Sequence, residues 1–413
     1  MVYHLCYAAY LDKRILFCNA STNNMMEQEN FEMNGMIAQI HSIPSLIRDV
    51  TRSYDEALRT ALERAPVPSV KRIYLTGCGD SHHAAVGSEL AFEHLTGLPT
   101  EALTSLQFGR YAADTLPRSE PGANLVIGIS VSGEVSRTLE ALLLGKKYGA
   151  TTVAMTATPT SRIGRAAELM IDTTQPPFQD PPGTHIPGVR SYVANQVALL
   201  LVAIWIGEMR GHITMDETNI LRKEIQALGD AAEQTITSSD PVAQNLAEEW
   251  KDAQEFVFVG GGPNYASALF SAAKLLEASG DSAMGQDTEE WAHLQYFARS
   301  VNTPTFLISA GDRDLSRMTE VAAAARHIGR RVAAVVPASA SSVANQAHRV
   351  LPLAENVREM FSTVISVIPG SLFAAYRADV IGEPFFRNFV GGRSIEGGGG
   401  ISRIRNSDTL GLE

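Results

Sequence analysis

Small residues that form hydrogen bonds are concentrated in one stretch, GISVSGEVSRT, at residues 128–138. An apolar run precedes this stretch and an amphipathic run follows it, which predicts a turn between a strand and a helix. The unpaired N–H groups at the start of such a helix attract an anion, although the same residues would also serve as an ordinary N-cap. The residues that we expect to contact the anion are Ser130, Ser132, Gly133, Ser136 and Arg137.

A second glycine turn, GCGDSHH, follows another β-rich run at residues 77–83. Gly79 allows a close backbone approach, and Ser81 offers a further hydroxyl to the same ligand. Cys78 lies between two glycines without a neighbouring base, so we interpret it as a small packed residue rather than a nucleophile. Ser191, at the start of a long apolar segment, and Arg393, in the C-terminal tail, complete the expected substrate contacts.

A lysine and a glutamate, Lys274 and Glu277, are three residues apart, so they would share one face of a helix. In isolation such a pair is typical of a surface ion pair. The pair follows a third glycine turn, VGGGPN, and the run EEWAH with Glu290 and His293 comes soon after it. A carboxylate and a histidine are groups that transfer protons near neutral pH, so these residue types suit proton transfer.

The elements that must position these residues occur twice along the chain. RIYLTGCGDS matches EFVFVGGGPN, NLVIGIS matches PTFLISAG, and TTVAMTATP matches RVAAVVPAS. Each copy alternates continuously apolar strands with helical stretches, which predicts an α/β fold with two tandem doubly wound parallel sheets, each an αβα sandwich. Ligands of such sheets bind at the carboxyl ends of the strands, so the first two turns would lie on one edge.

The repeat also predicts the domain organisation. We expect an extension at 1–33, a first domain at 34–215 with the anion turn, and a helical linker at 216–250. A second domain at 251–390 would carry the glutamate and the histidine, and a Gly/Arg-rich tail would occupy 391–413. In the second copy Asp312 and Asp314 replace the serine turn, and carboxylates repel anions, so we expect one anion site per chain.

Composition excludes several classes of protein. The 413 residues carry a net charge of −11, which argues against nucleic acid or an anionic membrane as a partner. Three cysteines give no disulfide framework, and the longest apolar run is too short to span a bilayer. The N-terminus lacks the basic start of a signal peptide, so we expect a cytoplasmic protein.

The turns GCGDS and SVSGEVSRT, together with the duplicated α/β unit, resemble the sugar isomerase (SIS) domain family over about residues 34–393. That family includes the isomerase half of glucosamine-6-phosphate synthase and the fructosamine deglycases. The resemblance implies that the serine turn holds the phosphate of a phosphosugar. Val135 stands where the family pattern has a threonine, so that contact is lost unless Ser136 or Thr138 replaces it.

The resemblance also implies roles for the polar residues of the second copy. Glu277 would move a proton between C1 and C2, Lys274 would support the sugar, and His293 would assist ring opening. In the family this histidine comes from a second subunit, which implies a homodimer, and neither a metal nor a cofactor is needed. The family's C-terminal lysine is missing here, and the arginine-containing tail would be either a solvated segment or a positive lid.

These observations predict an aldose–ketose isomerase that acts through a cis-enediol on a hexose with an anionic 6-substituent, either a 6-phospho-sugar or a 6-sulfo-sugar. The first alternative is a phosphosugar deglycase or an aminosugar-phosphate deaminase, which would use the same base. The second alternative is a sugar-phosphate sensor without catalysis, which the presence of both Glu277 and His293 disfavours.

Overall fold

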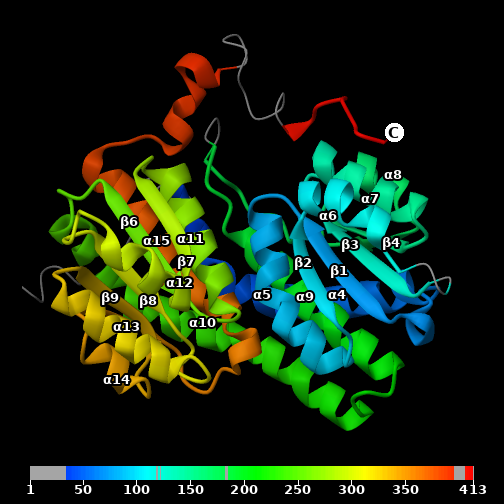
Figure 1. Ribbon diagram of the computed structural model, residues 1–413, viewed down its shortest axis with the longest axis horizontal. Coiled ribbons are helices and arrows are strands. Elements are labelled where there is room, and N and C mark those ends of the chain that lie inside the picture. The colour runs from blue at the N-terminus through cyan, green and yellow to red at the C-terminus, as the bar shows by residue number, and fades with distance from the viewer. Residues whose placement is uncertain (1–33, 118–119, 121, 182–184, 395–404, 413) are drawn as a thin grey trace, which may run out of the picture.

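The computed structural model describes residues 34–117, 120, 122–181, 185–394 and 405–412, so the expected extension at 1–33 lies outside the described residues. Two five-stranded parallel sheets form within this part of the chain, one in each half (Figure 1). The predicted fold class is confirmed. The apolar strands are buried on both faces, as their sequences require.

The first sheet has the order β2-β1-β3-β4-β5. Helices α4, α5 and α9 pack on its inner face, and α6, α7 and α8 cover its outer face. Its strands are β1 (Arg72–Gly77), β2 (Thr100–Thr104), β3 (Asn124–Ile129), β4 (Thr151–Thr156) and β5 (Leu169–Asp172). The helices are α3 (Gly35–His41), α4 (Ile43–Leu62), α5 (Asp80–Thr96), α6 (Ser105–Tyr111), α7 (Ser136–Lys147), α8 (Arg162–Ala166) and α9 (Arg190–Met209).

The second sheet repeats this order, because β7-β6-β8-β9-β10 matches it strand for strand. Its outer face is covered by α12, α13 and α14. The strands are β6 (Glu255–Gly260), β7 (Ser282–Asp287), β8 (Pro304–Ile308), β9 (Arg331–Pro337) and β10 (Arg349–Leu353). The helices are α11 (Asn264–Ala278), α12 (Thr288–His293), α13 (Leu315–His327), α14 (Ser341–Ala344) and α15 (Thr363–Ile381).

Among the described residues, two helices, α9 and α15, are long and apolar enough by composition to cross a membrane. Of the most apolar 18-residue stretch of each helix, 89% in α9 and 78% in α15 is buried inside the protein, because each is the inner helix of its unit. Between the units runs α10 (Met215–Glu249), which starts with a capping box at Thr214 and Glu217 and packs against α15, α4 and α9. These helices merge into one continuous apolar core.

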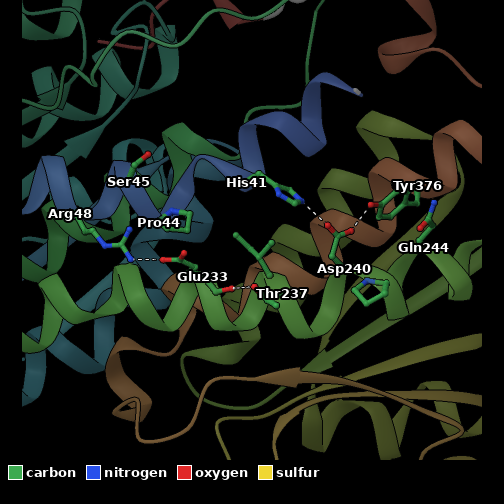
Figure 2. A pocket seen from close by; sticks show the side chains of 11 residues that line it. His41, Pro44, Ser45, Arg48, Glu233, Thr237, Asp240, Gln244 and Tyr376 are labelled. Carbon is green, nitrogen blue, oxygen red and sulfur yellow. Dashed lines mark hydrogen bonds and ion pairs between the residues drawn. The ribbon is translucent and has the colours of Figure 1, made fainter. Parts of the chain in front are cut away.

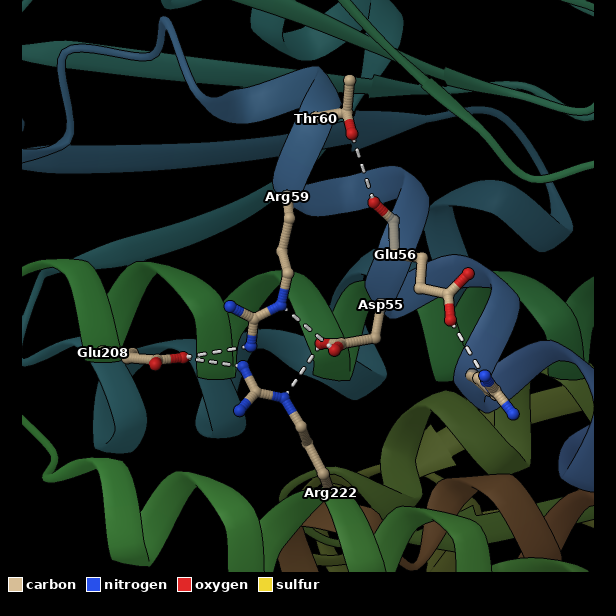
Figure 3. Close-up of polar contacts among 7 residues, drawn as sticks. Asp55, Glu56, Arg59, Thr60, Glu208 and Arg222 are labelled. Carbon is tan, nitrogen blue, oxygen red and sulfur yellow. Dashed lines mark hydrogen bonds and ion pairs between the residues drawn. The ribbon is translucent and has the colours of Figure 1, made fainter.

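Charged side chains fix the helical layer at its edge (Figure 3). Arg222 on α10 lies 2.9 Å from the Asp55 carboxylate of α4 and 2.7 Å from the Glu208 carboxylate of α9. Arg59 adds a second contact to Asp55 along α4. The network therefore joins three helices, α4, α9 and α10, that are far apart in the sequence.

The two units meet through α5 on one side and α11 and α15 on the other. Gly87 on α5 permits this close approach, because a Cβ there would lie 3.1 Å from Ala266 and 3.2 Å from Thr363. Gln196 of α9 accepts a hydrogen bond from the Thr363 hydroxyl across the same contact. This contact sets where residues on α11 lie relative to the turns of the first sheet.

Candidate active site

The two turns of the first unit lie side by side. Strands β1 and β3 are hydrogen-bonded neighbours, and Gly77 at the end of one pairs with Ile129 at the end of the other. The turn at 128–138 leads into α7, and the turn at 77–83 leads into α5. Both therefore open at the carboxyl edge of the sheet, where α/β proteins bind ligands.

Gly133 is required at the centre of the anion turn. Its φ is +67°, and a Cβ there would lie 1.8 Å from the Ser161 hydroxyl. The turn therefore packs directly against the loop that follows β4. Gly79 also has a positive φ, and apart from its two chain neighbours no described residue has an atom within 4 Å of a Cβ built on it, which leaves room for a ligand.

The hydroxyls of the anion turn differ in what they contact. Ser130 is buried and its hydroxyl accepts the N–H of Gly133 at 3.2 Å, whereas Ser132 is exposed. Ser136 opens α7 and donates to the carbonyl of Ser407 in the tail. Thr138 faces inward to the Ser105 hydroxyl at 3.1 Å, so Ser136 is better placed to replace the missing threonine contact.

Two arginines lie at this turn. Arg137 contacts the Glu140 carboxylate and donates to the carbonyl of Thr409. Arg162, at the start of α8, donates to the Ser136 hydroxyl at 3.3 Å. Sequence reasoning missed Arg162, although its place just after the β4 turn is equivalent to that of the residues already chosen. The tail at 405–412 thus lies against α7 (Figure 1).

Lys274 joins the two units. Its Nζ lies 2.7 Å from the Asp80 carboxylate in the turn of the first unit and 2.5 Å from the Glu277 carboxylate on its own helix. The Lys274 side chain is fully buried, whereas Asp80 and Glu277 are 29% and 24% exposed. The two carboxylates are therefore accessible to solvent, whereas the lysine that contacts both of them is not. Asp80 was missed because nothing local marks it as a partner of a residue 194 positions later.

Burial and charge shift the pKa values in this cluster. Burial raises the pKa of Glu277, Asp80 raises it further, and Lys274 and Arg405 oppose the rise. Burial alone would lower the pKa of Lys274, but the two carboxylates outweigh this and raise it. Lys274 therefore stays charged, while Glu277 is shifted toward the pKa range of a general base.

Arg387 stabilises the end of the helix that carries Glu277. Its guanidinium donates to the carbonyl oxygens of Leu276, Glu277 and Ala278, which are the last carbonyls of α11. The tail contributes a second cation, Arg405, whose charge acts on Glu277. Arg393 is exposed and its charge acts on Arg387.

The remaining predicted residues lie at different distances from this cluster. Ser81 is buried in the first turn of α5, beside Asp80. Ser191 lies in the first turn of α9, and its hydroxyl is close to Gly188, 3.0 Å from the position that a Cβ on this glycine would take. The His293 side chain is 66% exposed at the end of α12, where it contacts Glu289 at 3.1 Å. Within one chain, His293 therefore pairs with Glu289 rather than with the Lys274 cluster.

The equivalent edge of the second sheet has a different chemistry. Asp314 accepts a hydrogen bond from the Ser309 hydroxyl at 2.6 Å, and burial raises the pKa of its carboxyl. Asp312 is exposed beside it. These carboxylates lie where the first unit has its serine turn, which disfavours an anion there.

Two further kinds of site can be compared with this cluster. Among the described residues, no group of three or more His, Cys, Asp or Glu side chains is arranged to hold a metal ion. A cavity of about 570 Å³ lies among α3, α4, α10 and α15 (Figure 2). Polar side chains of its lining already have partners, Arg48 with Glu233 and His41 with Asp240, and none of the predicted site residues lines it.

Part of the chain matches a known protein family. Residues 68–204, which lie in the first unit and include the anion turn, match the family described as the SIS domain. The chain is homologous to the isomerase domain of glutamine–fructose-6-phosphate aminotransferase [isomerizing]. It is 28% identical to the protein of that name from Gloeobacter violaceus over 361 residues, which cover 86% of this chain and 57% of the relative.

Solved structures agree on the fold. The C-terminal domain of glucosamine-fructose-6-phosphate aminotransferase from Francisella tularensis has a TM-score of 0.73 at 18% identity, covering 84% of this chain and 97% of that one. The glucosamine-6-phosphate deaminase from Thermotoga maritima has a TM-score of 0.63 at 17% identity, covering 84% and 95%. The chain spans little more than half the length of the curated relative, so the activity of the whole relative is not assigned to this chain.

Proposed function

We propose that this protein is an aldose–ketose isomerase for a hexose with an anionic 6-substituent. The observation that carries the proposal is the contact between Lys274 and Asp80, because it brings Glu277 to the turn beside the anion site. A carboxylate of raised pKa next to an anion-binding turn is what a proton transfer along an anionic sugar needs.

The proposed reaction uses few groups. Glu277 removes the proton from C2 of the open-chain aldose, leaving a cis-enediolate, and returns a proton to C1 while the hydroxyl proton of O2 passes to O1, which gives the ketose. The same carboxylate serves both steps, because both carbons present one face to it. Lys274 is fully buried, so its part is to hold the carboxylates rather than to touch the sugar.

The 6-substituent would bind at the anion turn. Ser132, Ser136 and the N–H groups around Gly133 offer hydrogen bonds, and Arg137 and Arg162 offer charge. In an acidic protein, such a focused set of donors is needed to hold an anion. Val135 removes one hydroxyl from the family's pattern, so a 6-sulfo-sugar is a proposed substrate alongside the 6-phospho-sugar.

We propose further that the active form is a homodimer in which His293 of one subunit serves ring opening in the other. An apolar patch supports this proposal. Phe297 is 75% exposed, and Met284, Leu294 and Val301 are also exposed on β7 and the segment that follows it. Exposed apolar side chains grouped in this way are typical of a protein interface, and His293 adjoins them.

The alternative enzyme is a deaminase or deglycase, which shares the base and the enediol. The fold is similar to that of a protein named as a glucosamine-6-phosphate deaminase, which is compatible with this alternative. A non-catalytic sensor would bind the same anion without proton transfer.

The test is an incubation in D₂O with 6-phospho- and 6-sulfo-hexoses, their 2-amino derivatives and neutral hexoses. Deuterium at C1 of the ketose and at C2 of the recovered aldose, restricted to 6-anionic hexoses, is the expected result. Release of ammonia or an amine would identify the alternative enzyme, and binding without exchange would identify a sensor. Equal turnover of neutral hexoses would contradict the anion site.

A further inference from the structure

Asp80 has no assigned part in the proposed reaction, yet it is the residue through which the first unit reaches the base. It begins α5, directly after Gly79, and one carboxylate oxygen lies 2.7 Å from Lys274 Nζ. The other oxygen lies 3.8 Å from Nδ1 of His83. Lys274 therefore divides its hydrogen bonds between a carboxylate from each unit.

The surroundings of Asp80 make this sharing consequential. Tyr192 of α9 and His83 of α5 interact with it electrostatically from the first unit, and Lys274 and Glu277 of α11 from the second. Burial lowers the pKa of His83 to about 4, so its ring is neutral near pH 7, and burial keeps Tyr192 protonated. Lys274 is thus the cation in direct contact with Asp80, and the two carboxylates compete for it.

The consequence for Glu277 follows from the charges. With a single carboxylate partner, a fully buried lysine would hold Glu277 as a tight ion pair and make it a poor base. With Asp80 present, one positive charge faces two negative charges, and Asp80 raises the pKa of Glu277.

We propose that Asp80 is a positioning residue for the proton transfer: it takes part of the hydrogen bonding of Lys274 and so frees the Glu277 carboxylate to act on the sugar. The kinetic test of this proposal rests on the proposed function, because it measures isomerase turnover. The proposal predicts that the basicity of Glu277 depends on the contact between the two units, because Asp80 belongs to the first unit and Lys274 to the second.

The kinetic test compares the pH dependence of kcat/KM for wild type, Asp80→Asn and Asp80→Glu. Activity requires ionised Glu277, so it falls as the pH drops through the pKa of that group. Asp80→Asn removes a negative neighbour of Glu277, so the pKa of Glu277 and the acidic limb of the profile should move down by about 1 pH unit. The weaker base should also lower the plateau value of kcat. Asp80→Glu keeps the charge and should leave the limb close to that of wild type.

The matched control is Asp240→Asn. Asp240 is a partly buried carboxylate that accepts hydrogen bonds from His41 and Tyr376 in the remote cavity, so this variant should leave the limb unmoved. A merely structural bridge at Asp80 would lower stability without shifting the limb. An Asp80→Asn limb at the position of wild type would therefore overturn the proposal.

A second readout needs no turnover. The carboxyl ¹³C signal of Glu277, assigned through its loss in Glu277→Gln, should titrate at lower pH in Asp80→Asn than in wild type. An unchanged titration would overturn the inference about Asp80 even if the kinetics failed. Absence of isomerase activity in the wild-type protein would instead overturn the proposed function without affecting this titration, and the two failures are thus distinguishable.

Discussion

The hydroxyl of Ser136, the first residue of α7, donates a hydrogen bond to the carbonyl of Ser407, which lies 271 residues later in the chain. The neighbouring Arg137 does the same to Thr409. Two donors of the anion turn are therefore occupied by carbonyl oxygens of the chain's own tail.

A bound anion should compete with the tail for these donors. We expect hydrogen exchange at residues 405–412 to become faster when a 6-phospho- or 6-sulfo-hexose is added, because the anion replaces the carbonyls of Ser407 and Thr409. Hydrogen exchange followed by mass spectrometry measures this, with a neutral hexose as the control. Slower exchange with the anionic sugar would show that the tail closes over the ligand instead.

Replacement of Glu277 by Gln should remove deuterium exchange at C2. Loss of a general base costs about 10²–10⁴-fold in rate, while the amide keeps the size of the side chain and a hydrogen bond to Lys274. In the wild type, burial raises the pKa of Glu277, so activity should fall on the acidic side at a pH above the ordinary titration of a glutamate. A variant that keeps more than a few per cent of turnover would exclude this residue as the base.

Gly133→Ala should disrupt the anion turn. The new methyl group would lie 1.8 Å from the Ser161 hydroxyl at a φ of +67°, so both a clash and backbone strain are expected. The cost in unfolding free energy should exceed that of Gly149→Ala, where φ is +86° but no described atom lies within 4 Å of the new Cβ. Strain alone accounts for about 1–3 kcal/mol. Chemical denaturation of both variants measures the difference, and equal costs would mean that the loop around Ser161 yields.

Mixing two inactive variants tests the shared site. If His293 acts in the partner's site, His293→Ala and Glu277→Gln chains that exchange subunits should form dimers with one intact site, and part of the activity should return. Phe297→Glu, in the exposed apolar patch, should shift the protein toward monomers in sedimentation and lower its activity. Failure of complementation between chains that demonstrably exchange would argue that each site is built within one chain.

Acid should destabilise the protein partly through His83. Burial lowers its folded-state pKa to about 4, below the unfolded value of about 6.5, so the unfolded chain binds a proton more readily. Stability is then complete above pH 6.5 and falls as the pH drops toward 4, by up to about 3 kcal/mol. His83→Gln should flatten this part of the curve, whereas His293→Gln, at an exposed position, should leave it unchanged. Denaturation midpoints between pH 4 and 8 that run parallel in wild type and His83→Gln would contradict the assignment.

Local sequence determined the repeated architecture of this protein. Apolar strands such as NLVIGI can be buried only between two layers of helices, and the glycine turns after them mark the ends of the strands. That is why the sheet edge, the serine turn and the pair of Lys274 and Glu277 could be predicted: each depends on spacing within a few residues, which the covalent chain fixes.

Tertiary structure alone decided which side chains meet across the sequence. Asp80 reaches Lys274 because α5 packs against α11, Arg162 reaches Ser136 because β4 lies beside β3, and Ser407 reaches the same serine because the tail returns to the first unit. These contacts follow from the packing of helices on sheets rather than from local propensity. The charge balance at Glu277 therefore depends on how the two units dock, because Asp80 and Lys274 come from different units.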